Sequence, residues 1–128
     1  MNLLLDTHAF LWFIAGNTRL SQQARELIED QSNAKLVSVA SLWEIGIKIS
    51  LGRLDLAQPF EELIPRQMQI NGFGLLPLRI PHIAKVISLP FHHRDPFDRV
   101  IAGQCMAEDL SLVSADPSFD KYSVRRLW

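Results

Sequence analysis

Cysteine is nearly absent from this sequence, and its charge is nearly balanced. Cys105 has no second cysteine to pair with, so an internal disulfide is excluded, and we expect a small buried side chain in a reducing cytoplasm. With 13 basic and 14 acidic residues, the formal net charge is −1. This balance excludes a strong overall attraction to nucleic acid or to anionic membranes. Any polyanionic partner must therefore be held by local groups.

Long apolar runs and linkers are missing as well. No stretch reaches the ~18 uninterrupted apolar residues of a spanning helix, so we expect no membrane partner. The apolar start, MNLLLDTHAFLWFIAG, has no basic residues ahead of it and is interrupted by Asp6 and His8, so we interpret it as part of the fold and not as a signal peptide. A length of 128 residues, 48% of them apolar, fits one domain over residues 1–128.

What is present is an alternation of short apolar runs and helical patterns. Continuous apolar runs predict buried strands at residues 2–6, 35–39, 73–78, 110–115 and 123–128. Helices are predicted at 7–16, 21–31, 40–52, 59–70 (interrupted at Pro65), 82–89 and about 96–109, with a short helical turn at 117–122. This order predicts a three-layer α/β fold with a mostly parallel sheet covered on both faces. Ligands of such folds bind beyond the carboxyl ends of the strands.

Four acidic residues fall near that edge. Asp6 follows the first predicted strand, Asp116 follows the fourth, and Glu44 lies in the first turn after the second strand. Asp98 lies in the first turn of the helix before the fourth strand. It joins the other three only if that helix begins at the same edge of the sheet.

Each of these acids also has an interpretation as helix capping. Asp6 and Asp116 each stand directly before a predicted helix, in the position of an N-cap. Ser41 and Glu44 fit the S-x-x-E capping box, and Lys48 stands one turn beyond Glu44 as an ion-pair partner.

The segment HHRDPFDRVIAGQ carries two acids three residues apart. Asp95 before Pro96 predicts a helix cap, which leaves Asp98 at the third helical position. Asp95 would then support the helix that presents Asp98.

Capping alone does not require a carboxylate at each of these positions, because serine and asparagine cap about as well. Two unpaired carboxylates ~4 Å apart repel by about 4 kcal/mol at an effective dielectric constant near 20. No lysine or arginine adjoins Asp6 or Asp116 in the sequence, and a set of oxygen ligands suits Mg²⁺ or Mn²⁺. The four acids together therefore predict a divalent metal site.

The four acids lie in four ordered motifs, LLLDTHAFLW, VSVASLWEIGIKISLGRL, DPFDRVIAGQ and LVSADPSF. These motifs resemble those of the PIN domain family, and specifically of its small VapC-like ribonuclease toxins, and the resemblance covers nearly the whole chain. The resemblance implies a three-layer α/β/α PIN-like domain with a parallel five-stranded sheet in the order 3-2-1-4-5.

The resemblance also implies a function. It is that of a cytoplasmic endoribonuclease, dependent on Mg²⁺ or Mn²⁺, which acts as the toxin of a type II toxin–antitoxin pair and hydrolyses RNA by metal-activated water. It assigns metal binding and catalysis to Asp6, Glu44, Asp98 and Asp116, and supporting roles to Thr7, Ser114 and Asp95. For Asp95, an additional acid in this motif, the role of an occasional metal ligand stays open beside that of a helix cap. The implied partners are RNA, a cognate antitoxin and a second copy of the chain.

Several alternatives stay open. The chain is also compatible with a non-catalytic PIN-like binding module whose acids hold a structural ion or cap helices. Lys48 and Arg99, which lie near the acids in sequence, are expected to contact RNA phosphates. His92 and His93 have neither cysteine neighbours nor the helical spacing of a zinc site, which argues against zinc. Trp43 is expected in the core because of its helical spacing.

Overall fold

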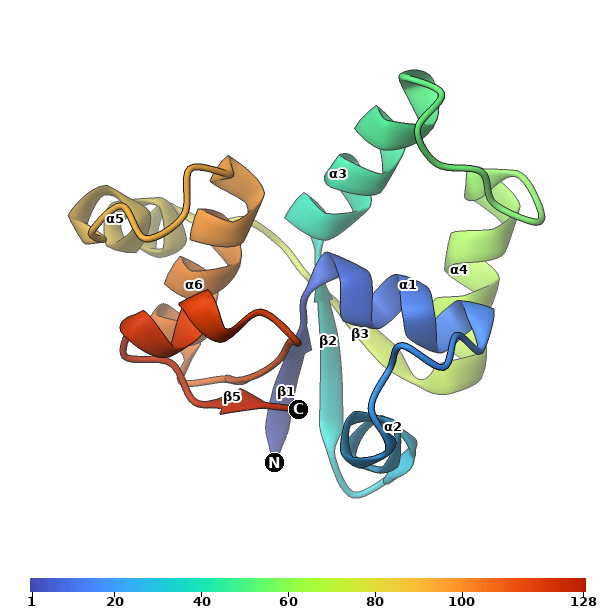
Figure 1. Cartoon of the computed structure of the whole chain (residues 1–128), viewed down its shortest axis with the longest axis horizontal. Coiled ribbons are helices and arrows are strands. Elements are labelled where there is room, and N and C mark those ends of the chain that lie inside the picture. The colour runs from blue at the N-terminus through green and yellow to red at the C-terminus, as the bar shows by residue number, and fades with distance from the viewer.

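The computed structural model describes residues 1–128 as a five-stranded parallel sheet with helices on both faces (Figure 1). The strands are β1 (Asn2–Leu5), β2 (Ala34–Ser38), β3 (Phe73–Leu76), β4 (Ser111–Val113) and β5 (Arg126–Leu127). Their order across the sheet is β3-β2-β1-β4-β5, and every neighbouring pair is parallel. The predicted fold class and strand order are confirmed.

Helices connect these strands and cover the sheet. They are α1 (Thr7–Ala15), α2 (Gln22–Glu29), α3 (Val39–Ser50), α4 (Phe60–Asn71), α5 (Ile80–Ser88) and α6 (Pro96–Glu108), with a 3-10 helix, η1 (Pro117–Lys121), after β4. None of the helices combines the length and the apolar character that crossing a membrane requires.

The central strand β1 shows how the sequence builds two cores. Successive side chains of a strand point to opposite faces of its sheet. Leu3 and Leu5 pack into a core with Phe10 of α1, whereas Leu4 packs into a second core with Ile101 of α6. All three leucines are fully buried, as the continuous apolar run predicts. Figure 1 accordingly shows α1, α2 and α4 on one side of the sheet and α5 and α6 on the other.

Three of the four predicted caps are confirmed. Asp6 accepts a hydrogen bond from the amide of Ala9 (2.8 Å), Asp95 from Phe97 (2.8 Å) and Asp116 from Ser118 (2.9 Å). These bonds satisfy amides that a helix start would otherwise leave unpaired. The same carboxylates therefore begin their helices and stand at the edge of the sheet.

The capping box predicted from Ser41 and Glu44 is wrong. The helix α3 begins at Val39, directly after β2, and Ser38 caps it by accepting from the amide of Ala40 (3.1 Å). Because the last strand residue is itself the cap, Glu44 stands in the second turn of the helix and not in the first. Its side chain is free to bond elsewhere.

Two further expectations differ from the structure. The helix α4 runs continuously through Pro65, which removes only its own amide donor and does not end the helix. Trp43 is not in the core: 67% of its surface is exposed, and its ring packs edge-on against Phe97 (5.7 Å between centroids). The expectation that the side chain of Cys105 is buried is confirmed.

Close contact with α5 fixes the position of α6 in the fold. A Cβ atom placed on Gly103 of α6 would lie 2.7 Å from Cγ2 of Val86 and 3.2 Å from the carbonyl oxygen of His82, both in α5. No side chain larger than hydrogen fits there without movement of a neighbour. The helix that carries Asp98 is therefore locked against α5.

We expect Gly103→Ala to destabilise the fold by about 1–3 kcal/mol, the usual cost of overpacking a filled interface. Gly46→Ala in α3 is the matched control, because its Cβ would meet no atom within 4 Å. It should be neutral or stabilise the fold by up to about 1 kcal/mol through helix propensity. Urea denaturation measures both changes, and a stabilising Gly103→Ala would contradict the close packing.

Candidate metal centre

The structure brings all four predicted acids into one cavity. The cavity has a volume of about 310 Å³ and lies at the carboxyl ends of β1, β2 and β4. Its lining residues are Asp6, Thr7, His8, Glu44, Lys48, Asp95, Asp98 and Asp116, and none is apolar. The start of α6 lies at this same edge, which was the step that the sequence alone left open for Asp98.

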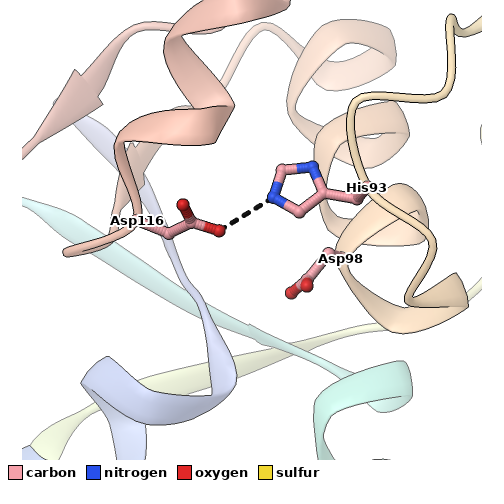
Figure 2. A group of neighbouring side chains, drawn as sticks. All are labelled: His93, Asp98 and Asp116. Atoms are coloured by element: carbon pink, nitrogen blue, oxygen red, sulfur yellow. Dashed lines mark hydrogen bonds and ion pairs between the residues drawn. The ribbon is translucent and has the colours of Figure 1, made fainter.

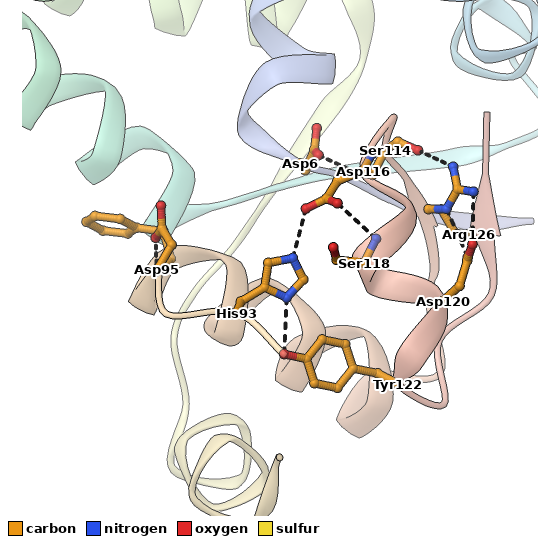
Figure 3. A network of polar contacts seen from close by, with 10 residues as sticks. Asp6, His93, Asp95, Ser114, Asp116, Ser118, Asp120, Tyr122 and Arg126 are labelled. Carbon is orange, nitrogen blue, oxygen red and sulfur yellow. Dashed lines mark hydrogen bonds and ion pairs between the residues drawn. The ribbon is translucent and has the colours of Figure 1, made fainter. Parts of the chain in front are cut away.

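Asp6 is buried and held from two sides. One oxygen caps α1, and the other accepts a hydrogen bond from the hydroxyl of Ser114 (Figure 3). That hydroxyl also accepts from the amide of Asp116 (3.0 Å), so Ser114 links the first and the last acid. Burial raises the pKa of Asp6, although the bonds from Ser114 and Ala9 oppose this rise.

Glu44 is held by a hydroxyl and an ammonium group. Its Oε1 accepts a hydrogen bond from Oγ1 of Thr7 (2.7 Å), and its Oε2 lies 3.0 Å from Nζ of Lys48. The Thr7 hydroxyl also lies within hydrogen-bonding distance of the Ser41 hydroxyl (3.0 Å). Thr7 and Ser114 thus occupy equivalent positions, each beside one of the acids.

Asp116 is held by a backbone amide and by a histidine. Its Oδ1 accepts from the amide of Ser118, and its Oδ2 lies 2.8 Å from Nε2 of His93 (Figures 2 and 3). Burial by itself would raise the pKa of Asp116. The bonds from His93 and Ser118 outweigh burial and bring the pKa below its usual value.

Asp98 is the exception, because its carboxylate has no hydrogen bond or ion pair. Figure 2 shows it beside His93 and Asp116 without a bond to either. Burial raises the pKa of Asp98 to about 7, and the neighbouring charges of Asp95 and Glu44 add to the rise. One ligand atom from each of His93, Asp98 and Asp116 lies within 4.8 Å of the others.

This set of donors fits a hard divalent cation. Five carboxylates line the cavity, whereas Lys48 is the only lysine or arginine among its lining residues. Carboxylate oxygens are the ligands that Mg²⁺ and Mn²⁺ prefer. Burial, with a further contribution from neighbouring carboxylates, raises the pKa of Asp98, and a cation beside it would favour the ionised form again.

Arg99 is not part of this cavity, which corrects the expectation that it contacts RNA. Its buried guanidinium group donates hydrogen bonds to the backbone carbonyls of Val86, Leu89 and Pro90. Its charged end lies 4.0 Å from the ring centre of Phe91. These contacts tie the start of α6 to the end of α5. Arg99 therefore helps to hold Asp98 in place from outside the cavity.

His93 is the site residue that sequence reasoning missed. It is separated from Asp116 by 23 positions, and no spacing pattern predicts that the two side chains meet. The available signal was its position in the same short segment as Asp95 and Asp98. His8, which also lines the cavity, had no distinguishing signal beyond its proximity to Asp6.

The fold and the cavity together define a parallel α/β domain that gathers carboxylates at the carboxyl edge of its sheet. Residues 3–124 match the model of the PIN domain. The chain belongs to the PIN domain family.

One curated relative is similar over part of the chain. Ribonuclease VapC16 of Mycobacterium tuberculosis (strain ATCC 25618 / H37Rv) is 35% identical over 60 residues, which are 47% of this chain and 41% of the relative. The match therefore spans less than half the length of that relative.

Solved structures share the whole fold. One is VapBC2 from Rickettsia felis bound to a DNA fragment from their promoter, with a TM-score of 0.73 at 14% identity, covering 99% of this chain and 98% of that one. Another is a toxin–antitoxin complex from Klebsiella pneumoniae, with a TM-score of 0.65 at 12% identity, covering 98% and 96%. At such identities the likeness concerns the fold.

We expect Asp98→Asn to stabilise the metal-free protein at high pH. The folded-state pKa of about 7 lies above the unfolded value of 3.8, so wild-type stability falls as pH rises through this window. After allowance for solvent screening, the variant should gain about 1–2 kcal/mol above pH 7 and almost nothing near pH 4. Thermal unfolding in a chelator measures this difference. The exposed Asp55→Asn serves as the control, and an Asp98→Asn effect independent of pH would contradict the assignment.

Proposed function

We propose that this chain is an endoribonuclease dependent on Mg²⁺ or Mn²⁺ and the toxin of a toxin–antitoxin pair. The observation that carries the proposal is the convergence of Asp6, Glu44, Asp98 and Asp116 in one cavity without apolar lining. Membership of the PIN domain family and the similarity to a ribonuclease support the choice of RNA as substrate.

The acids divide into those that are held and one that is free. Asp6 and Asp116 have fixed orientations and would act as ligands with set geometry. Asp98, with both oxygens unbonded, is the first choice for a direct ligand. Glu44 would act as a ligand or orient the attacking water. A bound Mg²⁺ or Mn²⁺ would lower the pKa of water and polarise the scissile phosphate.

Lys48 is the residue we assign to the substrate phosphate. Its ammonium group lies at the cavity and pairs with Glu44, and one third of its side chain is exposed. An RNA phosphate arriving at the cavity would find this charge already positioned. The pair also limits the repulsion between Glu44 and the approaching phosphate.

The rival function is a non-catalytic binding module whose acids only begin helices. The caps formed by Asp6, Asp95 and Asp116 favour this rival. It does not account for Asp98, which caps no helix, lacks a partner and has a raised pKa. A partly buried carboxylate without a partner lowers the stability of the fold, and groups that carry such a cost cluster at functional sites.

Purified, partner-free protein should cleave RNA in Mn²⁺ or Mg²⁺, and a chelator should abolish the cleavage. Asp6→Asn and Asp98→Asn should each lower the rate by a factor of about 100 or more, since electrostatic groups in active sites contribute on that order. Asp95→Asn should keep most of the activity, because asparagine caps nearly as well as aspartate.

The rate of single-turnover cleavage of a labelled RNA distinguishes the candidates. Equal cleavage by wild type, Asp6→Asn and Asp98→Asn would identify a contaminating nuclease and reject the proposal. A loss in Asp95→Asn as deep as in Asp98→Asn would reject the division of roles between these two acids.

We further propose two protein partners. A groove of about 420 Å³ lined by apolar residues such as Leu11, Trp12 and Leu54 shares His8 and Lys48 with the acidic cavity. A segment of a cognate antitoxin would fit this groove and cover the site. The similar solved toxin–antitoxin complexes support this partner.

A second copy of the chain is the other proposed partner. The helix α5 exposes Ile80, Ile83 and Ile87 along one stripe, by 82%, 46% and 79%. Phe91, just beyond the helix, is also exposed by 82%. Contiguous apolar surface of this kind marks interaction sites.

The mass in solution should be twice the 14.6 kDa of one chain. Ile87→Glu should give a monomer, because a charge would be buried in the proposed interface. Ile70→Glu, on α4 and similarly exposed at 68%, should leave the dimer intact. Light scattering after gel filtration measures the mass. A monomeric wild type would contradict the proposed dimer.

The antitoxin is tested by co-expression of this chain with the neighbouring gene product. If the two proteins form no complex, the proposed antitoxin partner is contradicted.

A further inference from the structure

His93 is buried in a setting unlike that of the other histidines near the site. Its Nε2 lies 2.8 Å from Oδ2 of Asp116, and its Nδ1 lies 3.1 Å from the hydroxyl oxygen of Tyr122 (Figure 3). The ring stacks almost parallel to that of Tyr122 and packs against Phe119, with centroids 4.4 Å apart. Only 9% of the residue is exposed.

The contacts on both nitrogens define which of them carries the proton. An ionised carboxylate accepts hydrogen bonds and cannot donate them, so Nε2 of His93 must donate to Asp116. The remaining nitrogen of a neutral ring, Nδ1, then accepts from the hydroxyl of Tyr122. Asp116 thus fixes the tautomer, and the hydroxyl of Tyr122, which can donate or accept, satisfies the other nitrogen by donating to it.

We propose that His93, whose second ring nitrogen is held by Tyr122, is a positioning residue that aims the Asp116 carboxylate at the metal ion; this inference rests on the proposed function. Asp116 is bonded at both oxygens, by Ser118 and by His93, so its carboxylate plane cannot rotate without breaking a bond. A ligand held in this way loses less freedom when it binds the ion.

The bond also joins two separate parts of the site. Asp116 follows β4, whereas His93 lies in the segment just before α6, the helix that carries Asp98. This hydrogen bond therefore links Asp116 to the segment that leads into the helix of Asp98. Such partners of ligands commonly contribute 10–100-fold to metal affinity.

His93 is not assigned as a direct ligand. Its Nε2 points its proton at Asp116, and its Nδ1 faces Tyr122, so neither nitrogen presents a free lone pair to the cavity. A direct nitrogen ligand would need the other tautomer, with Tyr122 accepting from Nδ1. The two roles differ in observable ways.

The test is Mn²⁺ affinity measured by titration calorimetry on folded protein. His93→Ala should weaken binding about 10-fold or more. His93→Gln should recover most of the affinity, because its amide nitrogen reaches the place of Nε2, and His93→Asn, which reaches only the place of Nδ1, should not. Tyr122→Phe should give an intermediate loss. His92→Ala, at the exposed neighbouring histidine, controls for local packing and should bind like wild type.

A double-mutant cycle shows whether His93 acts through Asp116. If it does, His93→Ala should cause no further loss of affinity in an Asp116→Asn background. An additive loss would overturn the inference. In metal-free wild type, nitrogen-15 NMR should show Nε2 of His93 protonated and Nδ1 unprotonated, and the opposite tautomer would also overturn it.

The outcomes separate this inference from the proposed function. A wild type that binds no Mn²⁺ would overturn the metal centre and the role of His93 with it. Normal wild-type binding with equal affinity in His93→Ala would overturn only the role of His93. Unfolding measured for each variant ensures that affinities are compared between folded proteins.

Discussion

Repulsion between carboxylates at one edge of the sheet is the constraint around which this molecule is arranged. Five acids line one small cavity, and most of them are held by donors that the fold supplies. Backbone amides at helix starts and the hydroxyls of Thr7 and Ser114 bond these acids without adding positive charge. Neutral donors fix the direction of every one of these carboxylates except that of Asp98, and they leave most of the negative charge in place. The bonded acids are thus fixed in direction while the site keeps an excess of negative charge.

Asp98 shows how the packing of distant elements produces this charge. It has no bonding partner, so it keeps its place only because α6 is locked to α5 through Gly103 and the buried guanidinium of Arg99. The free energy that burial of Asp98 costs is therefore offset by packing elsewhere in the same layer. A fold that allowed α6 to shift would let the charges separate and would lose the site.

The sequence predicted the fold and the acids well, for reasons that are local. Short stretches of chain specify buried strands and helix caps, so the α/β class and the caps at Asp6, Asp95 and Asp116 were within reach. The strand order is not local, and it was predicted only through the resemblance to the PIN domain family. Contacts that depend on tertiary packing were not within reach. The meeting of His93 with Asp116, the burial of Arg99 and the exposure of Trp43 each depend on how whole helices are placed. The capping box at Glu44 was predicted wrongly because Ser38, the last residue of β2, is itself the cap of α3.

The hydrogen bond between Ser114 and Asp6 joins residues 108 positions apart. The cavity is therefore a product of the folded chain as a whole, and no contiguous part of the sequence contains it. During synthesis the first acid is made early, but it gains its bond from Ser114 only after β4 has paired with β1. A chain whose synthesis has not yet reached β4 therefore lacks the assembled cavity. Local opening of the β1–β4 pair would separate Ser114 from Asp6 and disassemble the cavity in the complete chain.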